Sequence, residues 1–248
     1  TTGELKPLYD NSKENFEGWI TDHAGVIRIA TKTDGTDQVA YYRGSEKEPF
    51  TEYMRTGFKD SWNPLMFTFD NANLIVSHNL NGRDKTAVVE WNLAEKKETK
   101  VIYEDKDYDV SNVNYSQKRK VLTMVTWTGW KEERKILDDV TKGLYDKLAS
   151  KFEGYDYWIY GENDEETMFM VWAGNDRQPG KYYFYDATAD KLKEVATLRP
   201  WINEDHMAEM KPITYTTRDG LTIHGYLTLP VGREAKNLPV IINPHGGP

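Results

Sequence analysis

The stretch that decides the fold runs from residue 238 to residue 248 and reads Leu-Pro-Val-Ile-Ile-Asn-Pro-His-Gly-Gly-Pro. Its beginning is a continuous apolar run of the kind that is buried on both faces in a parallel sheet. The run leads straight into a glycine-rich turn, and α/β folds place ligand-facing backbone at such turns because glycine lets amide groups approach an anion. We therefore expect a buried strand over residues 238–243, followed by an anion-binding turn at residues 244–248.

The segment before this strand predicts a β-hairpin. Apolar and β-branched residues alternate along residues 211–217 and again along residues 221–229. Arg218, Asp219 and Gly220 lie between the two arms and supply the turn chemistry. The hairpin and the following strand together indicate the start of an α/β domain.

Residues 1–200 read as short strands separated by turns rather than as helices, which is typical of an all-β fold. β-branched and aromatic runs recur on both sides of glycine- and asparagine-containing segments. Three strand pairs are expected: residues 26–30 with 38–42, residues 74–78 with 87–91, and residues 168–172 with 182–185.

A faint repeat underlies these strands, with a spacing of about 45 residues, in the range of propeller blades. Its markers are Phe69-Asp70, Tyr115-Ser116 and Glu162-Asn163. One four-stranded blade cannot bury both of its faces alone and must stack on neighbours. We expect a partial β-propeller of about four blades, and a pair of β-sandwiches is the alternative. The expected units lie near residues 10–60, 65–108, 110–160 and 160–200.

One segment breaks the β pattern. Residues 136–152 carry apolar side chains at every fourth position, which predicts an amphipathic helix inserted between two strands of the third unit. We expect the helix to cover a sheet edge, and a lid over a substrate entrance is the alternative. The apolar stripe consists of Ile136, Val140, Leu144, Leu148 and Phe152.

Residues 216–230 and 238–248 together resemble the entry into the hydrolase domain of the prolyl oligopeptidase family of serine peptidases. The closest branch is the acylaminoacyl-peptidase and dipeptidyl-peptidase-like members. The resemblance implies a β-propeller over residues 1–205 and the first strands of a truncated α/β-hydrolase domain over residues 206–248. It also implies cleavage of short peptides by acyl transfer, with the propeller covering the active site and limiting substrate size.

The same resemblance implies that backbone N–H groups around Gly246 and Gly247 stabilise the oxyanion of the tetrahedral intermediate. Such a donor contributes about 3 kcal/mol in the transition state. His245 stands where some relatives have a tyrosine that performs this task, and it is not the catalytic histidine. The chain contains no Gly-x-Ser-x-Gly sequence and no serine after Ser150, so the whole catalytic triad is missing. We therefore expect a fragment that is inactive on its own.

Two adjacent carboxylates, Glu132 and Glu133, are candidate ligands for a cationic group such as a peptide amino terminus. Glu165 and Glu166 form a similar pair. Solvent-exposed charge is the alternative interpretation for both pairs.

The remaining ionisable residues favour no metal site or cofactor. Residues 105–109 alternate aspartates like the opening of a calcium loop, but Val110 and Ser116 occupy the positions that need glycine and a bidentate glutamate. An acidic turn is therefore expected. His23, His78 and His206 have no partner at metal-ligand spacing and are expected to be structural or surface residues.

Composition excludes several classes of protein. The absence of cysteine excludes a disulfide framework, a cysteine nucleophile and a cysteine-ligated metal. A net charge of −8 without basic clusters argues against nucleic-acid or anionic-membrane binding. The longest apolar run, residues 168–173, is far shorter than the about 20 residues that span a bilayer.

The expected partners are short peptides, and open sheet edges predict self-association. A stand-alone β-propeller that acts as a binding or scaffold module is the main alternative function. A propeller glycosidase that uses Asp70 or Glu162 as an acid is the third possibility, although no carboxylate pair identifies it.

Overall fold

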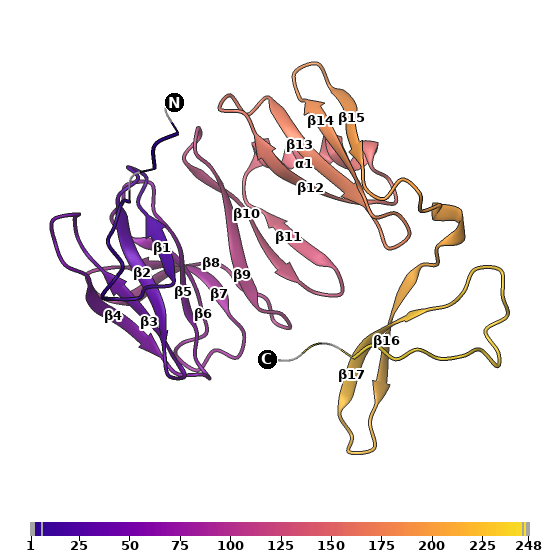
Figure 1. The fold of residues 1–248 in the computed structure, drawn as a ribbon, viewed down its shortest axis with the longest axis horizontal. Helices are drawn as coiled ribbons and strands as arrows, with labels where there is room; N and C mark the ends of the chain where they lie inside the picture. Colours follow the sequence, from indigo (N-terminus) through magenta and orange to yellow (C-terminus); the bar gives the residue numbers. More distant parts are fainter. Residues whose placement is uncertain (1–2, 6, 245, 247–248) are drawn as a thin grey trace. The chain divides into compact units, whose positions relative to one another are not determined.

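The computed structural model describes residues 3–5, 7–244 and 246. Within this part of the chain, antiparallel strands form three four-stranded sheets, one three-stranded sheet and one two-stranded sheet, accompanied by one α-helix. The chain divides into two compact units, Thr1–Lys142 and Gly143–Pro248. Figure 1 shows the strands of each sheet following one another in chain order. The expectation of a mainly β fold is confirmed.

The first unit begins with two four-stranded meanders. The expected pairing of residues 26–30 with 38–42 is confirmed, with Ala30 opposite Tyr41. The second expected pairing is confirmed as well, with Val76 opposite Val89. The strands are β1 (Gly18–Thr21), β2 (Ile27–Asp34), β3 (Asp37–Tyr42), β4 (Thr51–Thr56), β5 (Trp62–Phe67), β6 (Leu74–His78), β7 (Ala87–Asn92) and β8 (Lys97–Tyr103).

Strand β6 in the sheet β5–β8 is buried on both faces. Successive residues of a strand point to opposite faces, and every residue of β6 is buried. Leu74 and Val76 join one hydrophobic cluster, which includes Ile29 of the first sheet. Ile75 joins a second cluster with Val125 of the next sheet. The sheet that contains β6 therefore lies between the first and the third sheets and packs against both.

The third sheet has one strand fewer than its neighbours. It consists of β9 (Val110–Ser116), β10 (Val121–Thr128) and β11 (Glu132–Ile136), in the order β11-β10-β9. The chain then enters α1 (Asp139–Lys151) instead of adding a fourth strand.

The expected helix is present, but it begins later than its apolar stripe suggests. The carboxylate of Asp138 accepts hydrogen bonds from the backbone N–H groups of Val140 and Thr141, both at 3.1 Å, and this cap fixes the start of α1. Ile136 consequently belongs to β11, and Val140 is 64% exposed. These two residues were wrongly assigned to the buried stripe, whereas Leu148 is fully buried.

The second unit contains a four-stranded meander, in which Val171 lies opposite Tyr183 as expected. Leu148 and Phe152 of α1 belong to one hydrophobic cluster with Phe169 and Tyr185 of this sheet. The helix thus covers a sheet face, not an edge. The strands are β12 (Asp156–Glu162), β13 (Met168–Gly174), β14 (Lys181–Asp186) and β15 (Lys191–Thr197).

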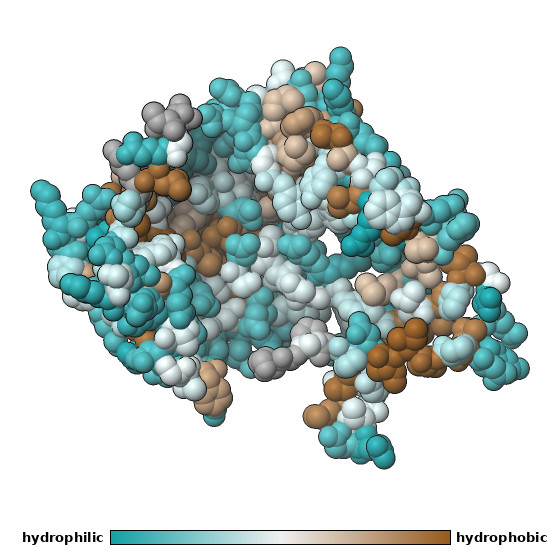
Figure 2. Space-filling model, in the orientation of Figure 1, coloured by the Kyte–Doolittle hydropathy of each residue, from teal (hydrophilic) through white to brown (hydrophobic). Residues whose placement is uncertain are grey.

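The predicted C-terminal hairpin is confirmed. Strands β16 (Met210–Thr216) and β17 (Thr222–Thr228) pair along their whole length, and the turn between them contains Gly220 at a φ of 86°. A short 3₁₀ turn, η1 (Glu204–His206), precedes the hairpin. Much of the apolar surface of the hairpin is exposed, and Figure 2 shows brown surface in this region.

The buried strand expected over residues 238–243 is not formed. These residues adopt no strand, and Val240, Ile241 and Ile242 are exposed at 79%, 95% and 84%. A parallel strand needs hydrogen-bonded neighbours on its sides. No described strand pairs with this segment, so its hydrophobicity alone does not produce a strand.

No helix among the described residues is long and apolar enough to cross a membrane. The division of the chain at residue 205 stays a prediction, as does the number of blades. The residues near that border form the turn η1.

Candidate functional site

The glycine-rich turn at residues 244–248 is the first candidate site. The structure describes Gly246, whereas His245 and Gly247 lie outside the described residues. A Cβ atom added to Gly246 would meet no described atom within 4 Å. The role of Gly246 as an oxyanion donor stays a prediction.

The connection that leads to the hairpin is anchored by side chains of the second unit. The hydroxyl of Tyr155 donates a hydrogen bond to Glu204 Oε2 at 2.9 Å, and Arg177 lies 3.4 Å from the other carboxylate oxygen. The Glu204 hydrogen bond raises the pKa of Tyr155. Asp176 accepts a hydrogen bond from the backbone N–H of Met210, the first residue of β16. These contacts tie the hairpin to the loops of the β12–β15 sheet.

The predicted carboxylate pair lies on the edge strand β11. Glu132 and Glu133 are both exposed and pair with Thr128 and Trp127 of β10. Because neighbouring residues on a strand point to opposite faces, the two carboxylates cannot converge on one cation. A substrate-binding role for this pair stays a prediction, and only one of the two carboxylates can bind a given cationic group.

Two other acidic candidates have structural partners. Asp70 accepts hydrogen bonds from the backbone N–H of Ala72 and the hydroxyl of Thr68, and the latter bond lowers the pKa of Asp70. Asp105 caps its own turn by accepting the N–H groups of Asp107 and Tyr108. No group of three or more His, Cys, Asp or Glu residues among the described residues is arranged to hold a metal ion.

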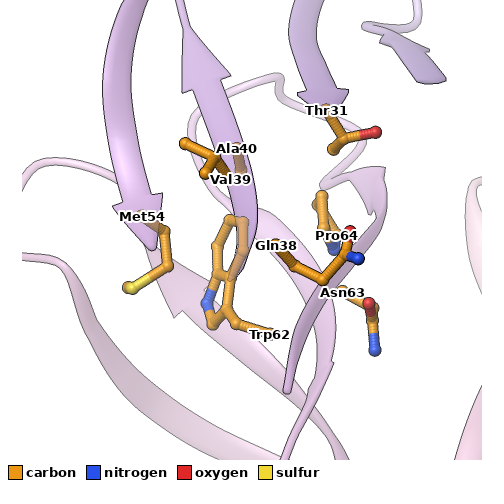
Figure 3. Close-up of a pocket in the computed structure, with 8 residues that line it drawn as sticks. All are labelled: Thr31, Gln38, Val39, Ala40, Met54, Trp62, Asn63 and Pro64. Atoms are coloured by element: carbon orange, nitrogen blue, oxygen red, sulfur yellow. The ribbon is translucent and has the colours of Figure 1, made fainter. Parts of the chain in front are cut away.

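A pocket of about 80 Å³ lies where the first and second sheets meet (Figure 3). The indole of Trp62 stands beside the thioether of Met54, with Gln38, Asn63 and Pro64 on its other side. No acid, base or paired nucleophile lines this pocket, so it lacks the groups that catalysis needs. The remaining lining residues are Thr31, Val39 and Ala40.

The structure reveals one ionisable cluster that the sequence interpretation missed. His78 is completely buried, and its Nε2 lies 3.0 Å from Oε2 of Glu98. Glu98 also binds Arg83 Nη1 at 3.0 Å, and Arg83 Nε lies 3.3 Å from Glu104. A histidine that ends the apolar run Leu-Ile-Val-Ser-His was the available signal, because an imidazole in such a strand needs partners.

His23 and His206 differ from His78. The ring of His23 stacks on Phe69 with 4.7 Å between the ring centroids, and its Nε2 lies 3.0 Å from the carbonyl oxygen of Phe67. His206 is exposed in η1. The expectation of structural or surface roles agrees with these placements.

Comparison with known proteins identifies relatives among peptidases. No profile of a known protein family matches the chain. The chain is 23% identical to dipeptidyl aminopeptidase BIII of Pseudoxanthomonas mexicana over 252 residues, which cover 98% of this chain and 36% of the relative. It is 22% identical to dipeptidyl peptidase family member 6 of Caenorhabditis elegans, covering 92% of this chain and 32% of that protein.

Solved structures show the same kind of fold. Oligopeptidase B from Trypanosoma brucei matches with a TM-score of 0.54 and 11% identity, over 88% of this chain and 32% of that protein. Prolyl oligopeptidase B from Galerina marginata, bound to a 35mer substrate, matches with a TM-score of 0.57 and 16% identity, over 82% of this chain and 30% of that protein.

The chain spans about a third of the length of the relatives that it matches. The resemblance inferred from residues 216–248 is confirmed, because the relatives are dipeptidyl aminopeptidases and the similar structures are prolyl oligopeptidases. The antiparallel sheets match the propeller domain of prolyl oligopeptidases.

Proposed function

We propose that this chain is the non-catalytic part of a serine peptidase that cleaves short peptides by acyl transfer. In this proposal, the sheets of residues 1–205 cover the active site and limit the size of the substrate. The observation that carries the proposal is the alignment with a dipeptidyl aminopeptidase, which extends over 98% of the chain. The mainly β architecture supports it.

The glycine-rich turn has a defined chemical role in this proposal. The backbone N–H groups of Gly246 and Gly247 donate hydrogen bonds to the oxyanion that forms when a serine attacks the peptide carbonyl. The attacking serine and the histidine that takes its proton lie outside this sequence. The chain therefore supplies transition-state stabilisation and access control, and it supplies no nucleophile.

The full-length peptidase containing this chain provides the decisive test. Gly246→Pro removes one backbone N–H and should lower kcat about 100- to 1000-fold. Gly246→Ala is the matched control, because it keeps the N–H and a Cβ at this position meets no atom within 4 Å. A proline variant that keeps the kcat of the alanine variant would refute the oxyanion role.

The isolated chain provides a second test. We expect it to hydrolyse no aminoacyl or dipeptidyl chromogenic substrate, because it has no serine after Ser150 to form an acyl-enzyme. Turnover by the isolated chain would show that the catalytic group has been misidentified. Size limitation is tested by comparing a dipeptide substrate with casein in the full-length enzyme, where cleavage of casein at a comparable rate would contradict it.

A further inference from the structure

The loop that joins β6 to β7, residues 79–86, is held by a buried histidine. The backbone N–H of Leu80 donates a hydrogen bond to Nδ1 of His78 at 3.1 Å. Since Nδ1 accepts this bond, the single proton of the neutral ring resides on Nε2. The His78 side chain is inaccessible to solvent, so no water can replace a lost partner without an opening of the structure.

The other ring nitrogen faces a carboxylate. Nε2 of His78 lies 3.0 Å from Oε2 of Glu98. Glu98 also accepts hydrogen bonds from Arg83, which belongs to the same loop. In the middle of the β6–β7 loop, Leu80 is thus held by His78 and Arg83 by Glu98, while Arg83 Nε also lies 3.3 Å from Glu104.

The remaining surroundings of His78 are uncharged. Trp62 of β5 and Ala87 of β7 lie opposite it in the sheet, and the ring of Trp91 meets it edge-on with 5.4 Å between centroids. Burial lowers the pKa of His78, the charge of Glu98 raises it in part, and the charge of Arg83 lowers it. The ring is consequently neutral at neutral pH and takes up a proton only in acid.

We propose that His78 is an acid-sensitive latch for the β6–β7 loop. A proton bound at Nδ1 converts this nitrogen from an acceptor into a donor, so it opposes the N–H of Leu80 and the hydrogen bond is lost. The imidazolium is at the same time drawn to Glu98, which competes with Arg83 for that carboxylate. Acid therefore weakens the Leu80 and Arg83 contacts, whereas the hydrogen bonds of Asn79 with Ser61 and of Thr86 with Asp109 hold the two ends of the loop.

The consequence is a change in one surface groove. Residues 80–83 form one wall of a groove of about 730 Å³, and residues 98–101 of β8 form the other. Asn81 and Gly82 in this wall adopt left-handed φ angles of 65° and 79°, so the turn depends on its flanking contacts. When Leu80 and Arg83 lose these contacts, residues 80–83 can move away from β8, while the strands β5–β8 remain paired.

Amide hydrogen exchange measures the latch directly. In the chain as it stands, the protection of the Leu80 amide should fall at least about tenfold as the pH is lowered from about 7.5 until the ring of His78 is protonated, which its ¹⁵N shifts report, after correction for intrinsic exchange. His78→Asn should remove this dependence, because the asparagine oxygen accepts the same N–H and does not titrate. His206→Asn is the matched control and should behave like the wild-type chain, because His206 is exposed.

Two results would overturn the proposal. One is a wild-type Leu80 amide whose protection stays constant over this range. The other is a His78→Asn variant that loses protection in acid as the wild-type chain does. If the asparagine variant does not fold, the ¹⁵N shifts of the wild-type ring decide: Nδ1 must change from unprotonated to protonated in step with the loss of protection, and a ring that stays neutral rules the latch out.

Discussion

The hydroxyl of Tyr53 accepts a hydrogen bond from the indole N–H of Trp91 at 3.0 Å, and this bond joins two separate antiparallel sheets. Tyr53 lies on the last strand of the first sheet, and Trp91 lies on the third strand of the second. The same hydroxyl donates to the carbonyl oxygen of Leu93 at 2.9 Å. One buried oxygen thereby satisfies two polar groups in an otherwise hydrophobic interface.

Removing that oxygen should destabilise the first unit. Tyr53→Phe leaves the Trp91 N–H and the Leu93 carbonyl buried without this partner, at a cost of about 1–3 kcal/mol. Tyr160→Phe is the matched control, because Tyr160 is 67% exposed, and its effect should stay below about 0.5 kcal/mol. Urea unfolding followed by tryptophan fluorescence measures both, and equal effects would contradict the interpretation.

The packing of helix α1 on the β12–β15 sheet should depend more on Leu148 than on the exposed side chains of the helix. Leu148→Ala removes a fully buried side chain from the cluster of the β12–β15 sheet, with an expected loss of about 2–5 kcal/mol. Val140→Ala tests the exposed side of the same helix, where we expect little change. Denaturant unfolding of the two variants gives the difference, and comparable losses would place the helix on the sheet in another orientation.

The carboxylate of Asp138 should make a pH-dependent contribution to the free energy of unfolding. Burial acts to raise the pKa of its carboxyl, but hydrogen bonds from Thr141 and Arg119 outweigh burial and hold the pKa below its ordinary value. A group with a depressed folded-state pKa stabilises the fold above its unfolded-state pKa, and this stability is lost as the pH falls through the folded-state pKa.

Asp138→Asn keeps an oxygen for the cap but removes the negative charge beside Arg119 and the helix N-terminus, so it should lower the free energy of unfolding by about 0.3–1 kcal/mol at neutral pH. The difference from the wild-type chain should shrink in acid, where the wild-type carboxyl is protonated as well. The neighbouring Asp139 is exposed, and Asp139→Asn serves as the control. A difference that does not change with pH would mean that the charge of Asp138 has no part in the cap.

The two glutamates of β11 should not be equivalent. Because Glu132 and Glu133 project to opposite faces, at most one of them contacts the amino terminus of a substrate. In the full-length peptidase, we expect only one of Glu132→Gln and Glu133→Gln to raise KM, by about tenfold or more. An amino-blocked substrate should not respond, and equal effects of both substitutions would contradict the geometry of the strand.

Turn residues and the alternation of apolar residues along the sequence are sufficient to predict most of the β-strands. The turn at Asn79–Gly82 between apolar runs predicts the β6–β7 hairpin, and Arg218-Asp219-Gly220 predicts the C-terminal one. Both predictions succeed because turn chemistry and strand alternation act over a few residues. The same locality explains why the 136–152 stripe predicts a helix.

The sequence-based predictions fail where contacts outside the segment itself determine its structure. Ile136 fits a helical stripe, but the Asp138 cap and pairing with Met124 place it in a strand. Residues 238–243 have the composition of a buried strand, yet the described chain offers them no paired neighbour. The partnership of His78 with Glu98 joins β6 to β8; the strand that ends in His78 indicates that the ring needs a partner, but it does not identify Glu98 as that partner.

The exposed segment Val240–Ile242 affects how readily the chain aggregates or is degraded in a cell. Three consecutive exposed residues that are β-branched and apolar favour sheet formation between chains. While they remain exposed, chaperones and proteases that act on incompletely folded chains can bind them. How long a newly made chain survives thus depends on how quickly this short stretch is covered.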